Sequence, residues 1–134
     1  MQESDLFDLL KNGFISDLKK SEDQFSRWDC VSHKFAYRIE LKCRKTHYDK
    51  LMLERDKYFA LILSYVETGY KPLYINSTPK GVYVFDLSEL NPEWTTDTRM
   101  PKTTDFENNN RVEKTYTLLE IKNAKKINQI DICI

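Results

Sequence analysis

Polar and apolar side chains alternate strictly over one stretch in the first half of the chain. The apolar positions are Phe35, Tyr37, Ile39, Leu41 and Cys43. The positions between them are mostly charged: Ala36, Arg38, Glu40, Lys42 and Arg44. Because successive side chains of a strand point to opposite faces, the pattern predicts a strand over residues 34–44 with one face in a core. The charged face either contacts solvent or takes part in chemistry.

Helical spacing of apolar residues marks two other segments. Residues 3–12 form a predicted helix that either ends at Gly13 or resumes toward Lys20. Residues 47–68 repeat apolar positions at steps of three and four, which predicts a longer helix that stops at Gly69.

Short runs rich in apolar and β-branched residues predict the remaining strands. These runs cover residues 25–31, 72–76, 81–87, 112–121 and 130–134. Residues 90–110 are polar and irregular, which predicts a long surface loop.

The two strands at 25–31 and 34–44 are close enough in sequence to form an antiparallel hairpin around a turn at 32–33. The hairpin would place Asp29 opposite the region 38–40. A slip of one residue in the pairing would move Asp29 to the other face, so the sequence leaves its exact position open.

The predicted order is helix, strand, strand, helix, strand, strand, loop and strand. This order indicates an α/β (α+β) fold with a central mixed sheet flanked by helices. The 134 residues fit a single domain, residues 1–134. No apolar run approaches the 18 residues of a membrane span, so we expect no membrane contact.

Charge and cysteine content narrow the function classes. Lysine plus arginine number 21, as do aspartate plus glutamate, so the net charge of zero gives no general attraction to nucleic acid. Residues 26–58 carry nine basic and five acidic side chains, and this positive segment contains the alternating strand. The three cysteines have no metal-type spacing, and no signal peptide precedes them, so we expect a cytoplasmic protein.

Asp29, Glu40 and Lys42 are the candidate catalytic residues. Two neighbouring carboxylates repel each other unless a cation lies between them, and their oxygen ligands suit Mg²⁺ or Mn²⁺. The carbonyl of Leu41 would be a further ligand. Lys42, one strand period after Glu40, could orient a water or stabilise the charge on a phosphate. Such a set suits phosphodiester hydrolysis, although the same charges are also common on a solvent-exposed strand.

These residues resemble the motif of the PD-(D/E)xK nuclease superfamily. The matching stretch runs from Trp28-Asp29 through ten residues to Glu40-Leu41-Lys42 and a following helix. Trp28 stands where the family motif has proline. The resemblance implies a restriction-endonuclease-like αβββαβ core over residues 3–87, with 88–134 as a C-terminal extension.

The resemblance also implies roles for single residues. Asp29 and Glu40 would bind metal together with the Leu41 carbonyl, and Lys42 would be the catalytic lysine. An acid on the first helix is a further metal ligand in many members, and Glu3 and Glu22 are the candidates here.

Basic side chains near this motif are candidates for contacts with phosphates. They are Arg38, Arg44, Lys45 and Lys57, and each can also be an ordinary surface charge. Trp28 and Trp94 can either stack on bases or pack in the core.

We therefore expect an Mg²⁺-dependent nuclease that cleaves DNA, with RNA not excluded, and that recognises structure more than sequence. A homodimer or a partner protein would supply further recognition. The alternatives are a non-catalytic member of the same fold that binds nucleic acid or protein, and an unrelated mixed domain. The unrelated domain predicts that Asp29 and Glu40 lie far apart.

Overall fold

A computed structural model describes residues 1–21, 26–101 and 111–127. Its two helices are α1 (Glu3–Gly13) and α2 (Arg55–Thr68). Its strands are β1 (Lys19–Lys20), β2 (Cys30–Ser32), β3 (Tyr37–Cys43), β4 (Lys50–Glu54), β5 (Lys71–Thr78), β6 (Gly81–Asp86), β7 (Thr95–Pro101), β8 (Arg111–Glu120) and β9 (Lys125–Ile127). Short 3-10 turns follow β6 at Leu87–Glu89 and β8 at Ile121–Asn123.

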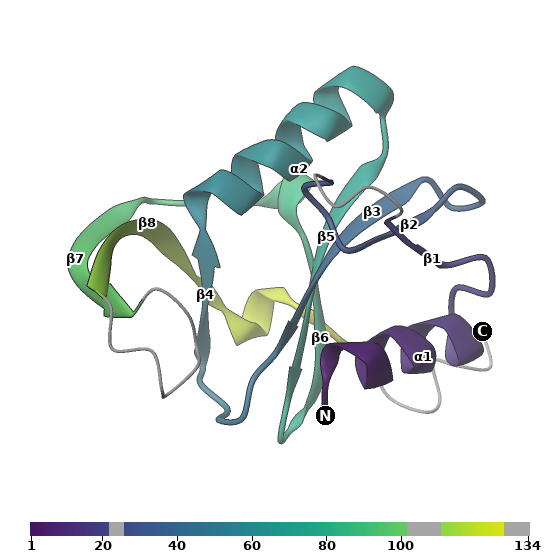
Figure 1. The fold of residues 1–134 in the computed structure, drawn as a ribbon, viewed down its shortest axis with the longest axis horizontal. Helices are drawn as coiled ribbons and strands as arrows, with labels where there is room; N and C mark the ends of the chain where they lie inside the picture. The colour runs from purple at the N-terminus through teal and green to yellow at the C-terminus, as the bar shows by residue number, and fades with distance from the viewer. Residues whose placement is uncertain (22–25, 102–110, 128–134) are drawn as a thin grey trace.

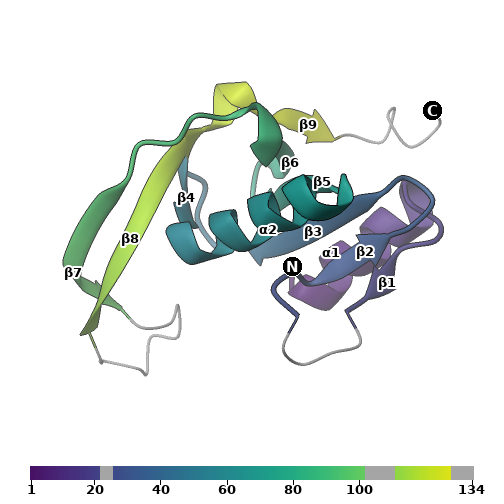
Figure 2. The same ribbon diagram turned by 90° about the horizontal axis from the view of Figure 1, so that it is seen from above.

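Six of the strands form one mixed sheet. Their order is β1-β2-β3-β5-β6-β9, and β3 and β5 are parallel while the other neighbours are antiparallel. Parallel neighbours need a crossover connection, and α2 lies on the chain between β3 and β5. The other three strands form a smaller antiparallel sheet in the order β4-β8-β7, at one side of the molecule in Figures 1 and 2.

The two helices cover opposite faces of the large sheet (Figure 1). On the α1 side, Leu6 and Leu10 pack with Ile39 and Leu41 of β3. On the α2 side, a second core contains Leu51, Leu53, Leu61, Tyr74, Phe85 and Leu87. Both faces of β3 are therefore covered, which is typical of strands next to a parallel pair.

The charged face of β3 is consequently not a solvent face. Glu40 is only 5% exposed, and Arg38, Lys42 and Arg44 are half-buried. These side chains point toward α2 because the alternate positions, such as Ile39 and Leu41, belong to the α1 core. Polar groups buried in this way need partners, and the site described below is made of those partners.

Several predicted elements are confirmed. α1, β3, β5, β6 and β8 lie where the sequence predicts them, within a few residues at their ends. Helix α2 ends at Gly69, which adopts the left-handed conformation with φ of 79° and donates its N–H to Tyr65. The first helix does not resume beyond Gly13, since β1 occupies Lys19–Lys20.

The predicted helix over 47–68 is wrong in its first part. Residues 50–54 form β4, and the helix begins at Arg55. Leu51 and Leu53 are both buried and point to the same face, which is strand periodicity within a run that also fits helical spacing. Pairing with β8 decides between the two periods. The buried face of α2 consists of Leu61 and Ser64.

The hairpin before α2 also differs from the prediction. β3 begins at Tyr37, because the turn spans residues 33–36 and ends at Ala36 with φ of 55°. Phe35 is 43% exposed and lies outside the core. β2 starts at Cys30, so Asp29 precedes it, and Ser32 belongs to β2 rather than to the turn.

The predicted loop over 90–110 contains a strand, β7, which pairs with β8. β9 was not expected from the sequence, and it pairs with β6. The predicted strand over 130–134 lies outside the described residues. Within the described part of the chain, no helix is long and apolar enough to span a membrane.

The strand assignment of β4 leads to a stability prediction. Leu53→Ala removes a side chain that is 1% exposed, and we expect it to lower the free energy of unfolding by about 2–4 kcal/mol. Leu118→Ala, at a β8 position that is 51% exposed, should change it by less than about 0.5 kcal/mol. Urea unfolding of both variants measures the two free energies of unfolding. Equal losses in the two variants would contradict the assignment of residues 50–54 to a strand with Leu53 buried.

Candidate active site

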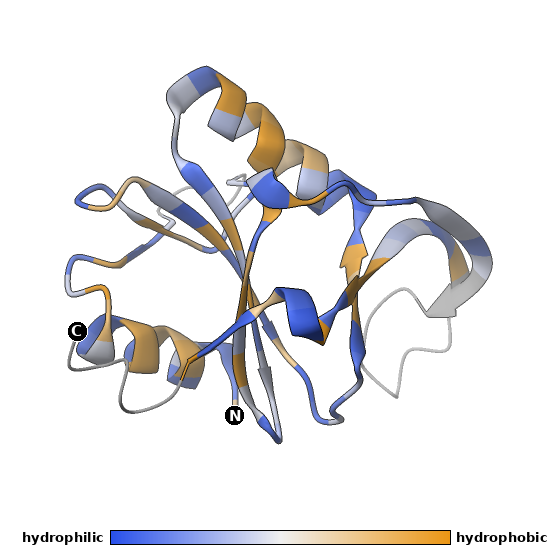
Figure 3. Cartoon of the chain, turned by 180° about the vertical axis from the view of Figure 1, so that it is seen from behind, coloured by the Kyte–Doolittle hydropathy of each residue, from blue (hydrophilic) through white to orange (hydrophobic). Residues whose placement is uncertain are grey.

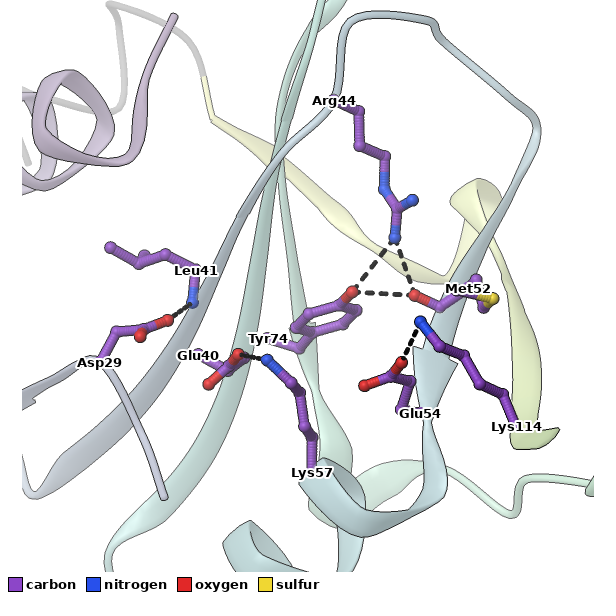
Figure 4. A network of polar contacts seen from close by, with 9 residues as sticks. All are labelled: Asp29, Glu40, Leu41, Arg44, Met52, Glu54, Lys57, Tyr74 and Lys114. Atoms are coloured by element: carbon purple, nitrogen blue, oxygen red, sulfur yellow. Dashed lines mark hydrogen bonds and ion pairs between the residues drawn. The ribbon is translucent and has the colours of Figure 1, made fainter. Parts of the chain in front are cut away.

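Glu40 is a buried carboxylate at the centre of the face that α2 covers. Burial raises its pKa to about 7, and the charge of Asp29 contributes, whereas Lys57 acts in the opposite direction. Lys57 lies in the first turn of α2 and donates a hydrogen bond to Glu40 Oε1 (Figure 4). Burial lowers the pKa of Lys57, but the Glu40 carboxylate outweighs that effect, so the pKa is raised. Lys57 is half exposed and offsets part of the cost of burying the Glu40 charge.

Asp29 lies beside Glu40 because its backbone and side chain both bind β3. Its N–H donates to the carbonyl of Ile39 at 2.9 Å, and its Oδ2 accepts the N–H of Leu41 at 2.7 Å (Figure 4). The N–H and C=O groups of one strand residue point toward the same neighbouring strand. The carbonyl of Leu41 therefore also faces the side on which Asp29 lies.

Glu3, the first residue of α1, adds a third carboxyl group. Its pKa is raised by burial, then by the negative charge of Asp29 and a hydrogen bond with that side chain. Glu3 also contributes to the raised pKa of Glu40. The three acids thus concentrate negative charge from α1, the segment before β2, and β3. Glu22, the other candidate for this further ligand, lies outside the described residues.

In the described part of the chain, no three Asp, Glu, His or Cys side chains are arranged to hold a metal ion as they stand. The ammonium of Lys57 binds one Glu40 oxygen, and Leu41 binds one Asp29 oxygen. Asp29 and Glu40 both line a cleft of about 250 Å³ between residues 26–29 and the start of α2.

Lys42 lies one strand period beyond Glu40 on the same face. Burial lowers its pKa, and the positive charges of Arg44 and Lys57 add to the effect, while Glu54 opposes it. Among the described residues, its ammonium group has no hydrogen-bond or ion-pair partner. Lys42 is therefore a half-buried cation available for a ligand.

The four predicted phosphate-binding residues lie in different surroundings. Arg44 donates to the side chains of Asn76 and Tyr74 and to the Met52 carbonyl, which ties β3 to β4 and β5 (Figure 4). Lys57 binds Glu40, and Lys45 is exposed after the end of β3.

Arg38 is packed between two rings. Its guanidinium carbon lies 4.3 Å from the Trp28 ring centre and 4.7 Å from that of Tyr70, and one guanidinium nitrogen donates to Ser64. The buried Nε of Arg38 has no hydrogen-bond partner among the described residues, and the two ring faces supply the electrostatic contact instead. Arg38 and Arg44 thus have structural roles in this conformation.

Two residues of this network escaped the sequence analysis. Glu54, at the end of β4, forms an ion pair of 2.9 Å with Lys114 of β8 (Figure 4), and both act on the pKa of Lys42. Residues 50–54 also fit strand spacing, and recognising that strand would have indicated Glu54 as a residue near the site. Nothing near Lys114 in sequence indicates that it would lie beside residues so distant along the chain.

No protein-family model and no curated protein matches the chain. Among solved structures, the 1.6 Å structure of Hjc from Archaeoglobus fulgidus, a Holliday junction resolvase from an archaeal hyperthermophile, is similar. The match covers 96% of this chain and 91% of that chain, with a TM-score of 0.57 and 19% identity.

The chain has a resolvase-like, restriction-endonuclease-like fold. The predicted order αβββαβ is present as α1, β1, β2, β3, α2 and β5, with β4 inserted before α2. At 19% identity the likeness concerns the fold, and the chemistry has to be argued from the side chains.

The raised pKa of Glu40 predicts a pH dependence of stability. Folding raises this pKa from 4.5 to about 7, so its stabilising contribution is complete below pH 4.5 and is lost as the pH rises through 7. In the metal-free protein this loss is on the order of 3 kcal/mol. The free energy of unfolding, measured by chemical denaturation, should fall from pH 4.5 to pH 8. The fall should be smaller in Glu40→Gln.

Glu120→Gln is the matched control, since Glu120 is an exposed partner of Lys122 far from the cleft. This variant should keep the wild-type slope. If the free energy of unfolding depends on pH equally in Glu40→Gln and the wild type, the raised pKa of the buried Glu40 is contradicted.

Proposed function

We propose that this chain is a metal-dependent nuclease of the PD-(D/E)xK type that hydrolyses DNA phosphodiester bonds. The observation that carries the proposal is the meeting of Asp29 and the buried Glu40 at β3, with the unpaired ammonium of Lys42 one strand period away. The likeness to a Holliday junction resolvase supports it. Residues 1–134 would act as one catalytic unit.

The donor set fits Mg²⁺ or Mn²⁺. Glu3, Asp29 and Glu40 are all oxygen donors; the charge of Asp29 raises the pKa of Glu3 and of Glu40, and a divalent cation would offset this repulsion. The Leu41 carbonyl adds a neutral oxygen. When bound, such an ion lowers the pKa of a water and neutralises charge on a phosphate.

Lys42 and Lys57 would act on the substrate rather than on the metal. Lys42 can donate a hydrogen bond to the attacking water or to a phosphate oxygen, because its ammonium is unpaired at the same face. Lys57 neutralises Glu40 in the metal-free protein, and once released it can bind a neighbouring phosphate. Lys45 would contact the backbone further away.

Recognition by structure is favoured over recognition by sequence. The net charge of zero gives weak general attraction to DNA, so recognition would depend on local contacts around the cleft. A second copy of the chain or a partner protein would extend the contact surface.

The second candidate is a non-catalytic binding protein with the same fold. The ion pair between Lys57 and Glu40 favours it, because this pair satisfies the buried carboxylate without any metal. The two functions predict different responses to metal and to changes at Lys42.

Cleavage assays separate these functions. We expect the protein to cut one or more labelled DNA forms, such as junctions, flaps, duplexes or single strands, only with Mg²⁺ or Mn²⁺. Lys42→Ala should slow cutting by about 100-fold or more, because it removes a charge from the reacting centre. Lys122→Ala, a 75% exposed lysine distant from the cleft, should leave the rate unchanged. Absent cutting of every form would support the binding protein, and cutting that does not need metal would overturn the proposed metal dependence.

Metal binding itself can be measured without any substrate. Calorimetric titration with Mn²⁺ should show one site whose dissociation constant rises at least about tenfold in Asp29→Asn, because a charged ligand becomes a neutral one. Glu120→Gln should bind as the wild type does. Equal affinity in Asp29→Asn and the wild type would remove Asp29 from the metal site.

A further inference from the structure

A second groove continues from the catalytic cleft along α2, and we call it the side groove. It measures about 430 Å³, within the usual range of small-molecule sites of roughly 300–1,000 Å³. Arg27, Trp28, Asp56 and Ala60 line both the side groove and the cleft at Asp29. The two spaces therefore adjoin, so different parts of one ligand could occupy both.

Part of the wall of the side groove is aromatic and apolar. Phe59 and Leu63, one helical turn apart on α2, are 52% and 59% exposed and line the groove. Figure 3 shows that apolar residues run along much of α2. Trp28 also lines the groove, and the Arg38 guanidinium carbon lies 4.3 Å from the centre of its ring. An exposed apolar wall beside a rigid indole suits a flat aromatic ligand.

The charges of the side groove argue against a phosphate and for a neutral base. Two basic residues, Arg27 and Arg38, line the groove, and Arg38 is already engaged with Ser64 and two rings. Asp56 and Glu67 bring negative charge, which repels phosphates. Carboxylates do accept hydrogen bonds from the amino groups of bases. The lysines near the reaction, Lys42 and Lys57, lie outside the side groove.

We propose that the side groove binds one unpaired nucleobase of the DNA strand whose phosphate lies in the cleft at Asp29 and Glu40. The inference rests on the proposed nuclease function and names its substrate class. A base inside an intact duplex would have to leave its stack to reach the groove. DNA that already contains an unpaired nucleotide, such as a bulge, a flap or an open junction, is therefore the favoured substrate.

The test compares two DNA ligands that differ only in one base. A duplex with a single bulged adenosine is compared with the same duplex in which that nucleotide is abasic, so the phosphates are unchanged. Binding is measured by fluorescence anisotropy with Mg²⁺ in the Lys42→Ala background, which prevents cutting. We expect the bulged adenosine to improve affinity about fivefold or more, which corresponds to a stacking free energy of about 1 kcal/mol.

Two matched variants assign that preference to the side groove. Leu63→Ser should reduce the ratio of the two affinities to about one, because it replaces an apolar wall by a hydroxyl. Leu118→Ser should preserve the ratio, since Leu118 is also exposed, at 51%, but lies on β8 outside the groove. Both positions are exposed, so both variants are expected to fold, and circular dichroism checks this.

Three outcomes would overturn the inference. Equal affinity for the adenosine and abasic bulges rules out the base site, while Mg²⁺-dependent cutting by the wild type leaves the nuclease proposal intact. An unchanged ratio in Leu63→Ser, with a dimer in the wild type and a monomer in the variant by sedimentation, would assign this face to a second copy. Absence of both DNA binding and cutting would remove the base site together with the proposed function.

Discussion

The hydrogen bond from the Leu41 N–H to the Asp29 carboxylate is the constraint on which the site depends. β2 pairs with β3 only from Cys30 to Ser32, so β3 continues beyond Ile39 without a strand on that side. A buried N–H without an acceptor costs about 1–3 kcal/mol, and Asp29 supplies the acceptor. The carboxylate that completes the backbone bonding is thereby fixed beside Glu40, so the same interaction stabilises the fold and concentrates negative charge.

Helix α2 covers the charged face of β3 and thereby determines how strongly these charges interact. Without the helix, the even positions of β3 would face water, and Glu40 and Lys42 would be ordinary surface residues. Under the helix, Glu40 is 5% exposed and needs Lys57 as a counter-charge. Charge interactions are stronger where water is excluded, so a change at one of these residues is felt by the others.

The sequence predicts what depends on local order. The alternation in β3 and the short hairpin before it are local, which is why the sequence places Asp29 opposite the region 38–40, although it leaves the exact register open. The start of α2 was wrong because residues 50–54 fit two periods, and only the pairing with β8 selects the strand. The contacts of Lys114 and the position of Glu3 beside Asp29 depend on tertiary packing, which no local pattern records.

The pairing of β4 with β8 affects the order in which the site forms during synthesis of the chain. β4 runs directly into α2, so the start of the helix, where Lys57 lies, is anchored through a strand whose partner is residues 111–120. Contacts between distant parts of a chain form late, and on the ribosome this partner emerges after the rest of the site. In a nascent chain, the acids of the site are thus present well before β4 can pair with β8 and fix Lys57 over them. The start of α2 would therefore be anchored over these acids only after residues 111–120 have emerged.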